Sequence, residues 1–210
     1  MSQSHHLTII DHPLIQARLT RLRDQTTGLA EFRSNLREIA KLMTFEVTRE
    51  FELKEVQVET PIAMAKGAEP ARPIILVPIL RAGIGMLDGI LEILTDAQIG
   101  HIGMYRDEKT HQPESYYCKL PPNIADADVL LIDPMLATGN SAAEAAKQLR
   151  AAGARRIHFV CLVACPEGVE HFSKKNPDIP IYTAAVDSHL NENAYIVPGL
   201  GDAGDRYFGT

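Results

Sequence analysis

The chain contains little cysteine and no recognisable metal-ligand pattern. Its 210 residues include three cysteines, Cys118, Cys161 and Cys165, an odd number without zinc-ligand spacing. Cys161 and Cys165 lie in, or directly after, the apolar segment 159–164, so we expect small buried hydrophobic residues in a reducing compartment. The eight histidines are also scattered, without the H-E-x-x-H spacing of zinc hydrolases. These residues therefore indicate neither a disulfide framework nor a zinc site.

Long hydrophobic runs and excess positive charge are also missing. The longest apolar stretch, Ile74 to Leu80, is interrupted by Pro78 and is far shorter than the roughly 20 residues that cross a bilayer. The N-terminal MSQSHHLTIIDHP lacks the basic start and apolar centre of a signal peptide. A net charge of −6 argues against a broad surface for nucleic acid or anionic membrane, although it leaves room for a local anion pocket. We therefore expect a cytoplasmic protein with no nucleic-acid and no membrane partner.

The first 60 residues read as two helices and a strand. Residues 14–23 and 31–49 have helical periodicity; in the second segment Phe32, Leu36, Ile39, Met43 and Val47 recur at steps of three and four. Residues 52–59 alternate polar and apolar, as a half-buried strand does, and residues 66–73 carry the signals of turns and a loop.

From residue 74 onward, strands and helices alternate. Continuous apolar strands are expected at 74–79, 99–105, 129–133, 157–164 and 181–185, with helices at 83–94, 141–152 and 167–175. This order predicts an α/β fold, a parallel β-sheet core flanked by helices on both faces. Residues 107–123 are polar, contain three prolines and predict a long mobile loop or hairpin. The Gly-rich residues 186–210 keep enough apolar side chains to predict a packed, irregular cap. Residues 1–210 are expected to form one domain, with segments 1–60, 74–185 (the core) and 186–210.

The segment IDPMLATGNS, Ile132 to Ser141, joins a buried strand to a helix and predicts an anion site. Ligands of parallel sheets lie outside the carboxyl ends of the strands, where Asp133 is expected. The amides of Thr138 to Ser141 would open the next helix, and Gly139 permits close approach or positive φ. Simple capping of a turn and a helix would explain Asp133 or Ser141 alone, but not both together with the Thr-Gly pair. A Walker loop is excluded because Gly-Lys-Ser/Thr is missing.

Two arginines follow neighbouring strands. Arg81 opens the Gly-rich turn RAGIGMLDG, in which the lone Gly-x-Gly is weak evidence for a dinucleotide site. Arg106 directly follows the strand expected at 99–105. Each arginine alone is adequately explained as a solvated surface residue. Together, at strand ends opposite an anion cradle, they favour binding of a diphosphate.

At the level of longer motifs, the chain resembles the uracil phosphoribosyltransferase family, which has the type I phosphoribosyltransferase fold. The resemblance runs from His12 to the end and is carried by VPILRAGIGMLDG, GMYRDE, IDPMLATGNS, PEG and YIVPGLGDAGDRYFGT. It implies formation of UMP and diphosphate from uracil and phosphoribosyl diphosphate with Mg²⁺, in pyrimidine salvage. It further implies a homo-oligomer, dimer or tetramer, with helices 14–49 available for an interface, and GTP as an activator in some relatives.

The resemblance also implies a role for each motif residue. Asp133 would hold the ribose hydroxyls, Ala137 to Ser141 the 5-phosphate, and Arg81 and Arg106 the diphosphate. The residues implied to bind phosphoribosyl diphosphate are Arg81, Arg106, Asp133, Pro134, Met135, Leu136, Ala137, Thr138, Gly139, Asn140, Ser141 and Asp202. Those implied to bind uracil are Tyr195, Ile196, Gly201, Asp202 and Ala203. Arg106, Asp133 and Asp202 would be catalytic, with Mg²⁺ held by the substrate diphosphate and by Asp202 through water. Residues 107–123 would close over the reaction centre, and residues 186–210 would form a hood over the base.

Two positions depart from common patterns. Many type I enzymes place two acidic residues at the end of the phosphate-loop strand, whereas Ile132 precedes Asp133 here, a feature that the uracil branch shares. Asn140 stands where the family usually has a further glycine; asparagine tolerates left-handed φ better than most residues.

Three alternatives lack support in the sequence. A uracil-nucleotide-responsive regulator that binds RNA would need a basic face. A silent binding module would have lost Asp133, Arg81 or Asp202, all of which are present. A purine or orotate enzyme would lack the Gly-Leu-Gly-Asp-Ala segment.

Overall fold

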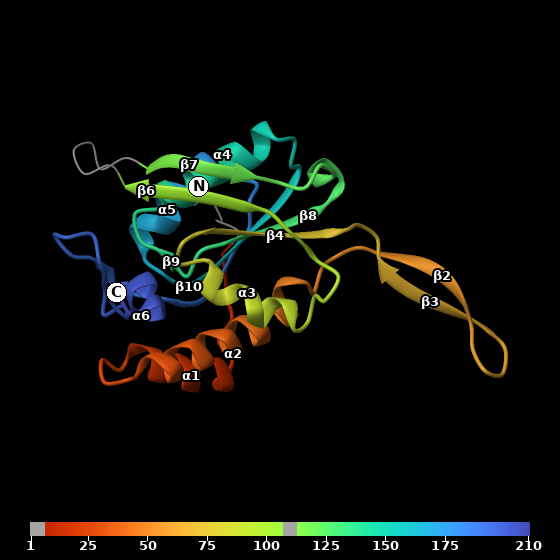
Figure 1. Cartoon of the computed structure of the whole chain (residues 1–210), viewed down its shortest axis with the longest axis horizontal. Coiled ribbons are helices and arrows are strands. Elements are labelled where there is room, and N and C mark those ends of the chain that lie inside the picture. The colour runs from red at the N-terminus through yellow and green to blue at the C-terminus, as the bar shows by residue number, and fades with distance from the viewer. Residues whose placement is uncertain (1–6, 107–112) are drawn as a thin grey trace, which may run out of the picture.

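A largely parallel sheet forms the centre of the molecule. The computed structural model describes residues 7–106 and 113–210. Seven strands of its nine-stranded sheet follow the order β1-β11-β10-β8-β4-β6-β7, and the other two, β5 and β9, pair with β4 and β10 (Figure 1). All pairs are parallel except β6 with β7. The strands are β1 (Leu7–Ile9), β4 (Ile74–Leu80), β5 (Gln98–Ile99), β6 (His101–Arg106), β7 (Pro113–Lys119), β8 (Asp128–Ile132), β9 (Met135–Leu136), β10 (Arg156–Ala164) and β11 (Ile181–Val186). The predicted α/β fold is confirmed.

Helices bury both faces of this sheet. In β8, Leu130 and Ile132 belong to the cluster formed with the N-terminal helices and α3, whereas Val129 and Leu131 belong to the cluster formed with α4 and α5. Successive strand residues point to opposite faces, so a strand covered on both sides is apolar throughout. The helices are α1 (Pro13–Arg23), α2 (Leu29–Val47), α3 (Ile84–Leu91), α4 (Asn140–Ala151), α5 (Pro166–Lys175) and α6 (Ala203–Phe208), with a 3₁₀ turn, η1 (Ile124–Asp126).

The C-terminal residues 186–210 form the packed cap that the apolar side chains predicted. β12 (His189–Leu190) and β13 (Ile196–Val197) pair antiparallel, and α6 follows. Ile196, Leu200 and Ala203 are buried in the same core cluster as α1 and α2. In Figure 1 this blue segment lies beside α1, at one end of the sheet. We call residues 186–210 the hood.

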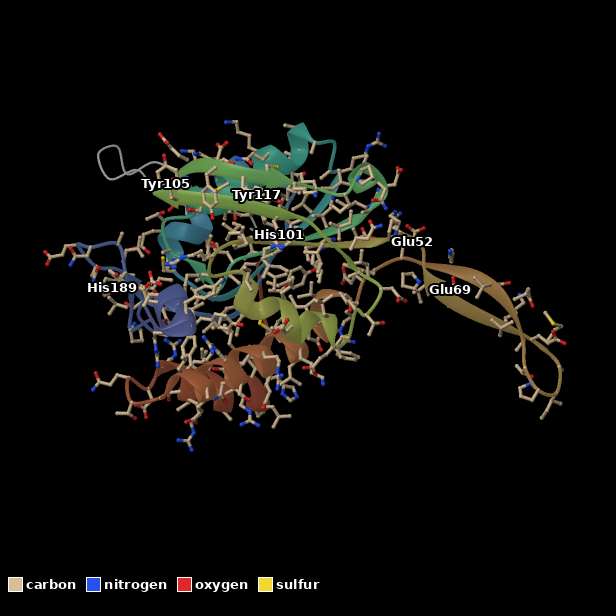
Figure 2. The ribbon with its side chains drawn as sticks, viewed as in Figure 1. Glu52, Glu69, His101, Tyr105, Tyr117 and His189 are labelled. Carbon is tan, nitrogen blue, oxygen red and sulfur yellow. The ribbon has the colours of Figure 1, made fainter. Side chains whose placement is uncertain are left out.

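A two-stranded hairpin projects from the body of the molecule. β2 (Leu53–Glu59) and β3 (Met64–Pro70) pair antiparallel in a sheet of their own, and Glu52 and Glu69 lie near its base (Figures 1 and 2). The prediction of a half-buried strand at 52–59 is wrong in its burial, because β2 is exposed everywhere except at the half-buried Val56. The loop predicted for 66–73 is wrong over its strand part, 66–70. Alternation predicts a strand, but it does not predict what covers it.

The segment 107–123 is a hairpin as far as the structure describes it. β7 pairs antiparallel with β6, with a register shift between Gly103 and Met104. Residues 107–112 and the side chain of Arg106 lie outside the described part. The mobility predicted for this segment therefore stays a prediction. Within residues 7–106 and 113–210, no helix combines the length and apolar character needed to cross a bilayer.

Candidate active site

A cavity of about 310 Å³ lies between the carboxyl ends of the central strands and the hood. From the segments after β4 and β8 come Ala82, Asp133, Met135 and Ala137; from the hood come Asn193, Ala194, Tyr195, Ile196, Gly201, Asp202, Ala203 and Gly204. Because β4 and β8 are neighbours in the sheet, their carboxyl ends place two loops side by side. The cavity therefore brings residues near position 80, residues 133–137 and the C-terminus together.

Glycine allows the turn after β4 to reach the end of β8. A Cβ added at Gly83 would lie 2.6 Å from the carbonyl oxygen of Ile132 and 2.7 Å from that of Ile79, distances that no side chain tolerates. The Leu80–Arg81 peptide directly before this turn is cis. The close approach holds Ala82 beside Asp133 at the rim of the cavity.

The N-terminus of α4, beside this cavity, is open to an anion. Among the helices of the described residues, α3 and α4 are the two with neither an N-cap side-chain hydrogen bond nor an acidic residue in the first turn. In α3, however, the first amides are already paired, since those of Ile84, Gly85 and Met86 donate to backbone carbonyl oxygens. Free amides and the positive end of the helix dipole favour negative charge at such ends. Gly139, the N-cap of α4, has φ 76°, so the predicted positive φ lies at this glycine. The Thr138 hydroxyl accepts a hydrogen bond from the Asn140 amide at 3.4 Å.

Asp133 carries a half-buried carboxyl group, and no described cationic side chain pairs with it. Its Oδ1 accepts a hydrogen bond from the Met135 amide at 3.3 Å, and among the side chains that the structure describes none forms an ion pair with it. Burial, reinforced by the nearby negative charge of Asp202, raises the pKa of Asp133 to about 7. A hydroxyl donor or a cation entering the cavity would favour its charged form.

The cavity side of the hood contains two unusual turns. Ala194 has φ 62° and Gly201 has φ 79°. The Asn191 side chain accepts hydrogen bonds from the amides of Asn193 at 3.0 Å and Tyr195 at 2.9 Å, which holds the first turn closed. Asp202 caps α6, with its Oδ1 accepting from the Asp205 amide at 2.8 Å. Local hydrogen bonds therefore set both turns.

Long-range side-chain contacts attach the hood to α1. Arg23 donates two hydrogen bonds of 2.7 Å to Asp187, and the same carboxylate accepts from the Gly199 amide at 2.9 Å. The Asp187 side chain is only 7% exposed, so this bidentate ion pair is largely withdrawn from water. Arg206 donates to the carbonyl oxygen of Leu200 at 2.9 Å and to those of Leu22 and Asp24 at the end of α1. These contacts hold the segment just before Gly201.

The predicted site residues other than the two arginines fall into three groups. Eight of them line the cavity: Asp133, Met135, Ala137, Tyr195, Ile196, Gly201, Asp202 and Ala203. Thr138, Gly139, Asn140 and Ser141 continue the loop into α4, and Asn140 also lines a groove beside α5. Pro134 and Leu136 are buried beneath the loop, where Pro134 accepts hydrogen bonds from the amides of Leu162 and Val163.

The two predicted arginines lie at the carboxyl ends of β4 and β6. Arg81 lies 3.8 Å from Asp205 and over the ring of Phe208, both on α6, and is 61% exposed. Arg106 ends β6, at the same edge of the sheet as Arg81, since β4 and β6 pair in parallel.

Sequence reasoning missed Asn193, Ala194 and Gly204 as lining residues. A signal for the first two is Asn191 in the sequence N-E-N, because asparagine commonly closes an Asx turn by accepting a hydrogen bond from an amide two residues on. Gly204 sits in the first turn of α6, where a Cβ would come within 3.1 Å of Asp202 Oδ1.

Two carboxylates border the cavity and suit a divalent cation shared with a ligand. Among the described residues no group of three or more His, Cys, Asp or Glu side chains could hold a metal. Mg²⁺ commonly uses one or two carboxylates plus substrate phosphate oxygens rather than a cage of protein ligands. Asp133 and Asp202, close enough for the charge of one to raise the pKa of the other, fit this arrangement.

Comparisons with known proteins show the family and the fold. Residues 9–210 match the family model described as uracil phosphoribosyltransferase. A uracil phosphoribosyltransferase of Geobacillus sp. strain WCH70 is 54% identical over 96% of this chain and 97% of its own length. That of Malacoplasma penetrans strain HF-2 is 52% identical, with 96% and 98% covered. The solved structure of the AQ2163 protein from Aquifex aeolicus superposes with a TM-score of 0.92 at 33% identity, over 97% of this chain and 98% of that one. A hypoxanthine phosphoribosyltransferase from Trypanosoma cruzi, 12% identical with a TM-score of 0.52 over 75% of each chain, shares the fold.

Proposed function

The chain belongs to the uracil phosphoribosyltransferase family, and we propose that it performs the family reaction in the cavity between the phosphate loop and the hood. It is a pentosyltransferase that transfers the phosphoribosyl group of phosphoribosyl diphosphate to uracil N1, giving UMP and diphosphate. The observation that carries this location is the convergence on one cavity of Asp133, the loop leading to an open helix N-terminus, and the hood.

Phosphoribosyl diphosphate would bind along the strand ends. The amides of residues 137–141 at the N-terminus of α4 suit the 5-phosphate, and Asp133 suits the ribose hydroxyls as an acceptor. Arg81 and Arg106 would hold the diphosphate at the carboxyl ends of β4 and β6, which pair in parallel. Arg81 can leave its present contact with Asp205 easily, since an exposed pair separated by 3.8 Å contributes little.

Uracil would lie against the hood. Tyr195, Ile196 and the backbone of Gly201 to Ala203 surround that side of the cavity. Uracil and cytosine differ at C4, where a carbonyl acceptor is replaced by an amino donor. A rigid backbone that satisfies one pattern leaves buried polar groups unpaired with the other, and this supports selection of uracil.

The reaction needs positioning and electrostatics more than a covalent nucleophile. As uracil N1 approaches the anomeric carbon and the bond to diphosphate breaks, positive charge spreads over the ribose ring, as in glycoside transfer. Asp133 and Asp202 would place negative charge near that ring, and Arg81 and Arg106 positive charge near the departing diphosphate. Mg²⁺ carried by the substrate, with Asp202 reaching it through water, would neutralise further charge on the diphosphate.

The test is UMP formation from uracil and phosphoribosyl diphosphate with Mg²⁺, beside cytosine, hypoxanthine and orotate, each with and without GTP. Turnover with uracil alone is expected, and the GTP arm decides the proposed activation. Asp133→Ala and Arg106→Ala should each lower turnover by about a hundredfold or more. Asp126→Ala and Arg155→Ala, changes at exposed residues away from the cavity, are matched controls. Near-normal rates in both site variants would refute the site.

We also propose a homo-oligomer, and the exposed hairpin β2–β3 supports this more directly than helices 14–49. Its exposed apolar residues are Leu53, Val58, Ile62 and Met64. An isolated two-stranded hairpin is at best marginally stable in water, and exposed apolar side chains grouped on it favour a protein cover. Ile62→Ser with Met64→Ser should shift the sedimentation coefficient toward the monomer. An unchanged sedimentation coefficient would show that the hairpin is not the interface. One domain spanning residues 1–210 and a cytoplasmic location stay predictions.

A further inference from the structure

The first turn of α5 lies between the phosphate loop and the hood. It carries Pro166, Glu167 and Gly168, a motif of the family resemblance to which the reaction gives no role. Pro166 begins the helix, where a missing amide costs nothing. The turn has one side toward residues 136–137 and the other toward β12.

On the loop side, this turn is fitted closely to the backbone. The Cys165 amide donates to the carbonyl oxygen of Leu136 at 3.2 Å, and its thiol donates to that of Ala137 at 3.2 Å. A Cβ added at Gly168 would lie 2.3 Å from the Ala137 oxygen and 2.4 Å from the Leu136 oxygen. Glycine is therefore required for the approach, and Ala137 lines the cavity. Cys165 is buried, as predicted, but it also orients the loop.

On the hood side, the same turn holds one end of β12. Glu167 Oε1 accepts a hydrogen bond from the Leu190 amide at 3.0 Å. Leu190 pairs with Ile196 of β13, and Ile196 lines the cavity. His189, the neighbour of Leu190, marks this edge of the hood in Figure 2. The Leu190 amide is the main reason that the pKa of Glu167 is lowered, so the acceptor is ionised near neutral pH.

We propose that the first turn of α5 is a spacer that sets the distance between the base and the phosphoribosyl group, with Glu167 and Gly168 as its positioning residues. Glu167 positions the uracil side through Leu190 and Ile196, and Gly168 positions the phosphate loop through Ala137. This rests on the proposed function. Transfer requires the reacting atoms to meet at about 3–3.5 Å, and a small misplacement is costly. A rigid turn touching both segments meets that requirement.

The two sides of the spacer depend on it to different degrees. β12 and β13 pair over two residues only, so the loop 191–195 has little support besides Glu167 and the Asn191 turn. The segment around Gly201 is held separately by Arg206 and Asp187. Loss of the Glu167 contact should therefore loosen the uracil side while the phosphate loop stays in place.

The kinetic test compares Glu167→Ala, Glu167→Gln and Glu170→Ala. Glu167→Ala should raise the KM for uracil on the order of fivefold to tenfold, while the KM for phosphoribosyl diphosphate stays within about twofold. Glu167→Gln should restore the uracil KM, because its amide oxygen can accept the same hydrogen bond. Glu170, exposed on the same helix, is the matched control and should leave both constants unchanged. Equal changes in both constants, or no rescue by glutamine, would overturn the proposal.

Gly168→Ala tests the other side. It should raise the KM for phosphoribosyl diphosphate about tenfold, with a smaller change for uracil, because the added Cβ displaces Ala137. A predominant rise in the uracil KM would contradict the assignment.

Hydrogen exchange gives a readout that does not need turnover. Amides of residues 189–197 should exchange faster in Glu167→Ala than in Glu170→Ala, with residues 137–141 unchanged. Unchanged exchange of residues 189–197 would refute the spacer. A wild-type chain that forms no UMP would instead refute the proposed function, and the exchange comparison would still decide the spacer.

Discussion

The phosphate loop and the hood border the same cavity but are held in different ways. Residues 133–141 lie between β8 and α4, adjacent elements of the chain, and main-chain hydrogen bonds to β10 fix the start of the loop. The hood depends on side chains from far away: Arg23 and Asp187 are 164 residues apart, and Arg206 and Leu22 are 184 apart. The position of the loop is set by the strand and helix on either side of it, whereas the position of the hood is set by side-chain contacts with α1.

This difference separates two parts of the chemistry. A phosphate needs amides and a helix dipole, which any strand–loop–helix unit can offer. Selecting one base needs a specific arrangement of donors and acceptors, which an irregular segment provides only when it is rigid. We therefore expect changes at the loop to affect phosphoribosyl diphosphate, and changes at the hood anchors to affect uracil.

The largest effect should come from Asp133→Asn. Turnover should fall about a hundredfold or more, because an amide replaces the carboxylate near the ribose. The free energy of unfolding, in contrast, should rise. Asp133 has a pKa of about 7 in the folded state and 3.8 unfolded, so the folded chain binds more protons between these values and wild-type stability falls as pH rises.

The gain in stability from asparagine should therefore grow from about pH 4 to about pH 7 and then level off, reaching on the order of 4 kcal/mol. Urea unfolding of both proteins across this range measures it. A gain that is independent of pH would mean that Asp133 is not the titrating group.

The second effect concerns the hood anchor. Arg23→Ala leaves the largely buried Asp187 carboxylate without its cation and should cost about 3 kcal/mol of unfolding free energy. The KM for uracil should rise more than that for phosphoribosyl diphosphate, because Gly199 loses its support just before Gly201. Arg18→Ala, which removes a more exposed ion pair on the same helix, is the control. Parallel increases in both constants would contradict the division between loop and hood.

The same contrast explains what could be predicted from the sequence. Strands from residue 74 onward and the role of Asp133 as a strand-end residue follow from local patterns: a buried run, a carboxylate, then Thr-Gly before a helix. The anchors Arg23 and Asp187 carry no local signal, since each looks like an ordinary charged residue until the fold brings them together. The hairpin β2–β3 was predicted in part, because its alternation is local, whereas the exposure of both strands among the described residues has no local signal.

Glycine in the loop gives a third, smaller effect. Gly139→Ala places a side chain at φ 76°, about 1–2 kcal/mol unfavourable, and its Cβ would lie 2.9 Å from the Gly168 oxygen. The KM for phosphoribosyl diphosphate should rise several-fold. Gly153→Ala is a matched control, because φ is 96° there but the nearest atom is 3.6 Å away. Gly153→Ala should lower the free energy of unfolding by a similar amount and leave the KM values of both substrates unchanged. A similar rise in the KM for phosphoribosyl diphosphate in this control would show that backbone strain alone explains the effect of Gly139→Ala.

The smallest effect should come from Asn140→Gly, the position at which this chain departs from its family. The sequence suggested that asparagine is acceptable here because it tolerates left-handed φ. That tolerance is not needed, because Asn140 is the first residue of α4 and has no positive φ. In the described part, the non-glycine residue with positive φ is Ala194. Glycine should then cost a helix position about 0.5 kcal/mol and leave the KM for phosphoribosyl diphosphate within about twofold. A tenfold lower KM would instead mean that the Asn140 side chain obstructs the phosphate. Phosphate binding would then depend on a side chain as well as on the main chain of the loop, which would weaken the contrast with the hood.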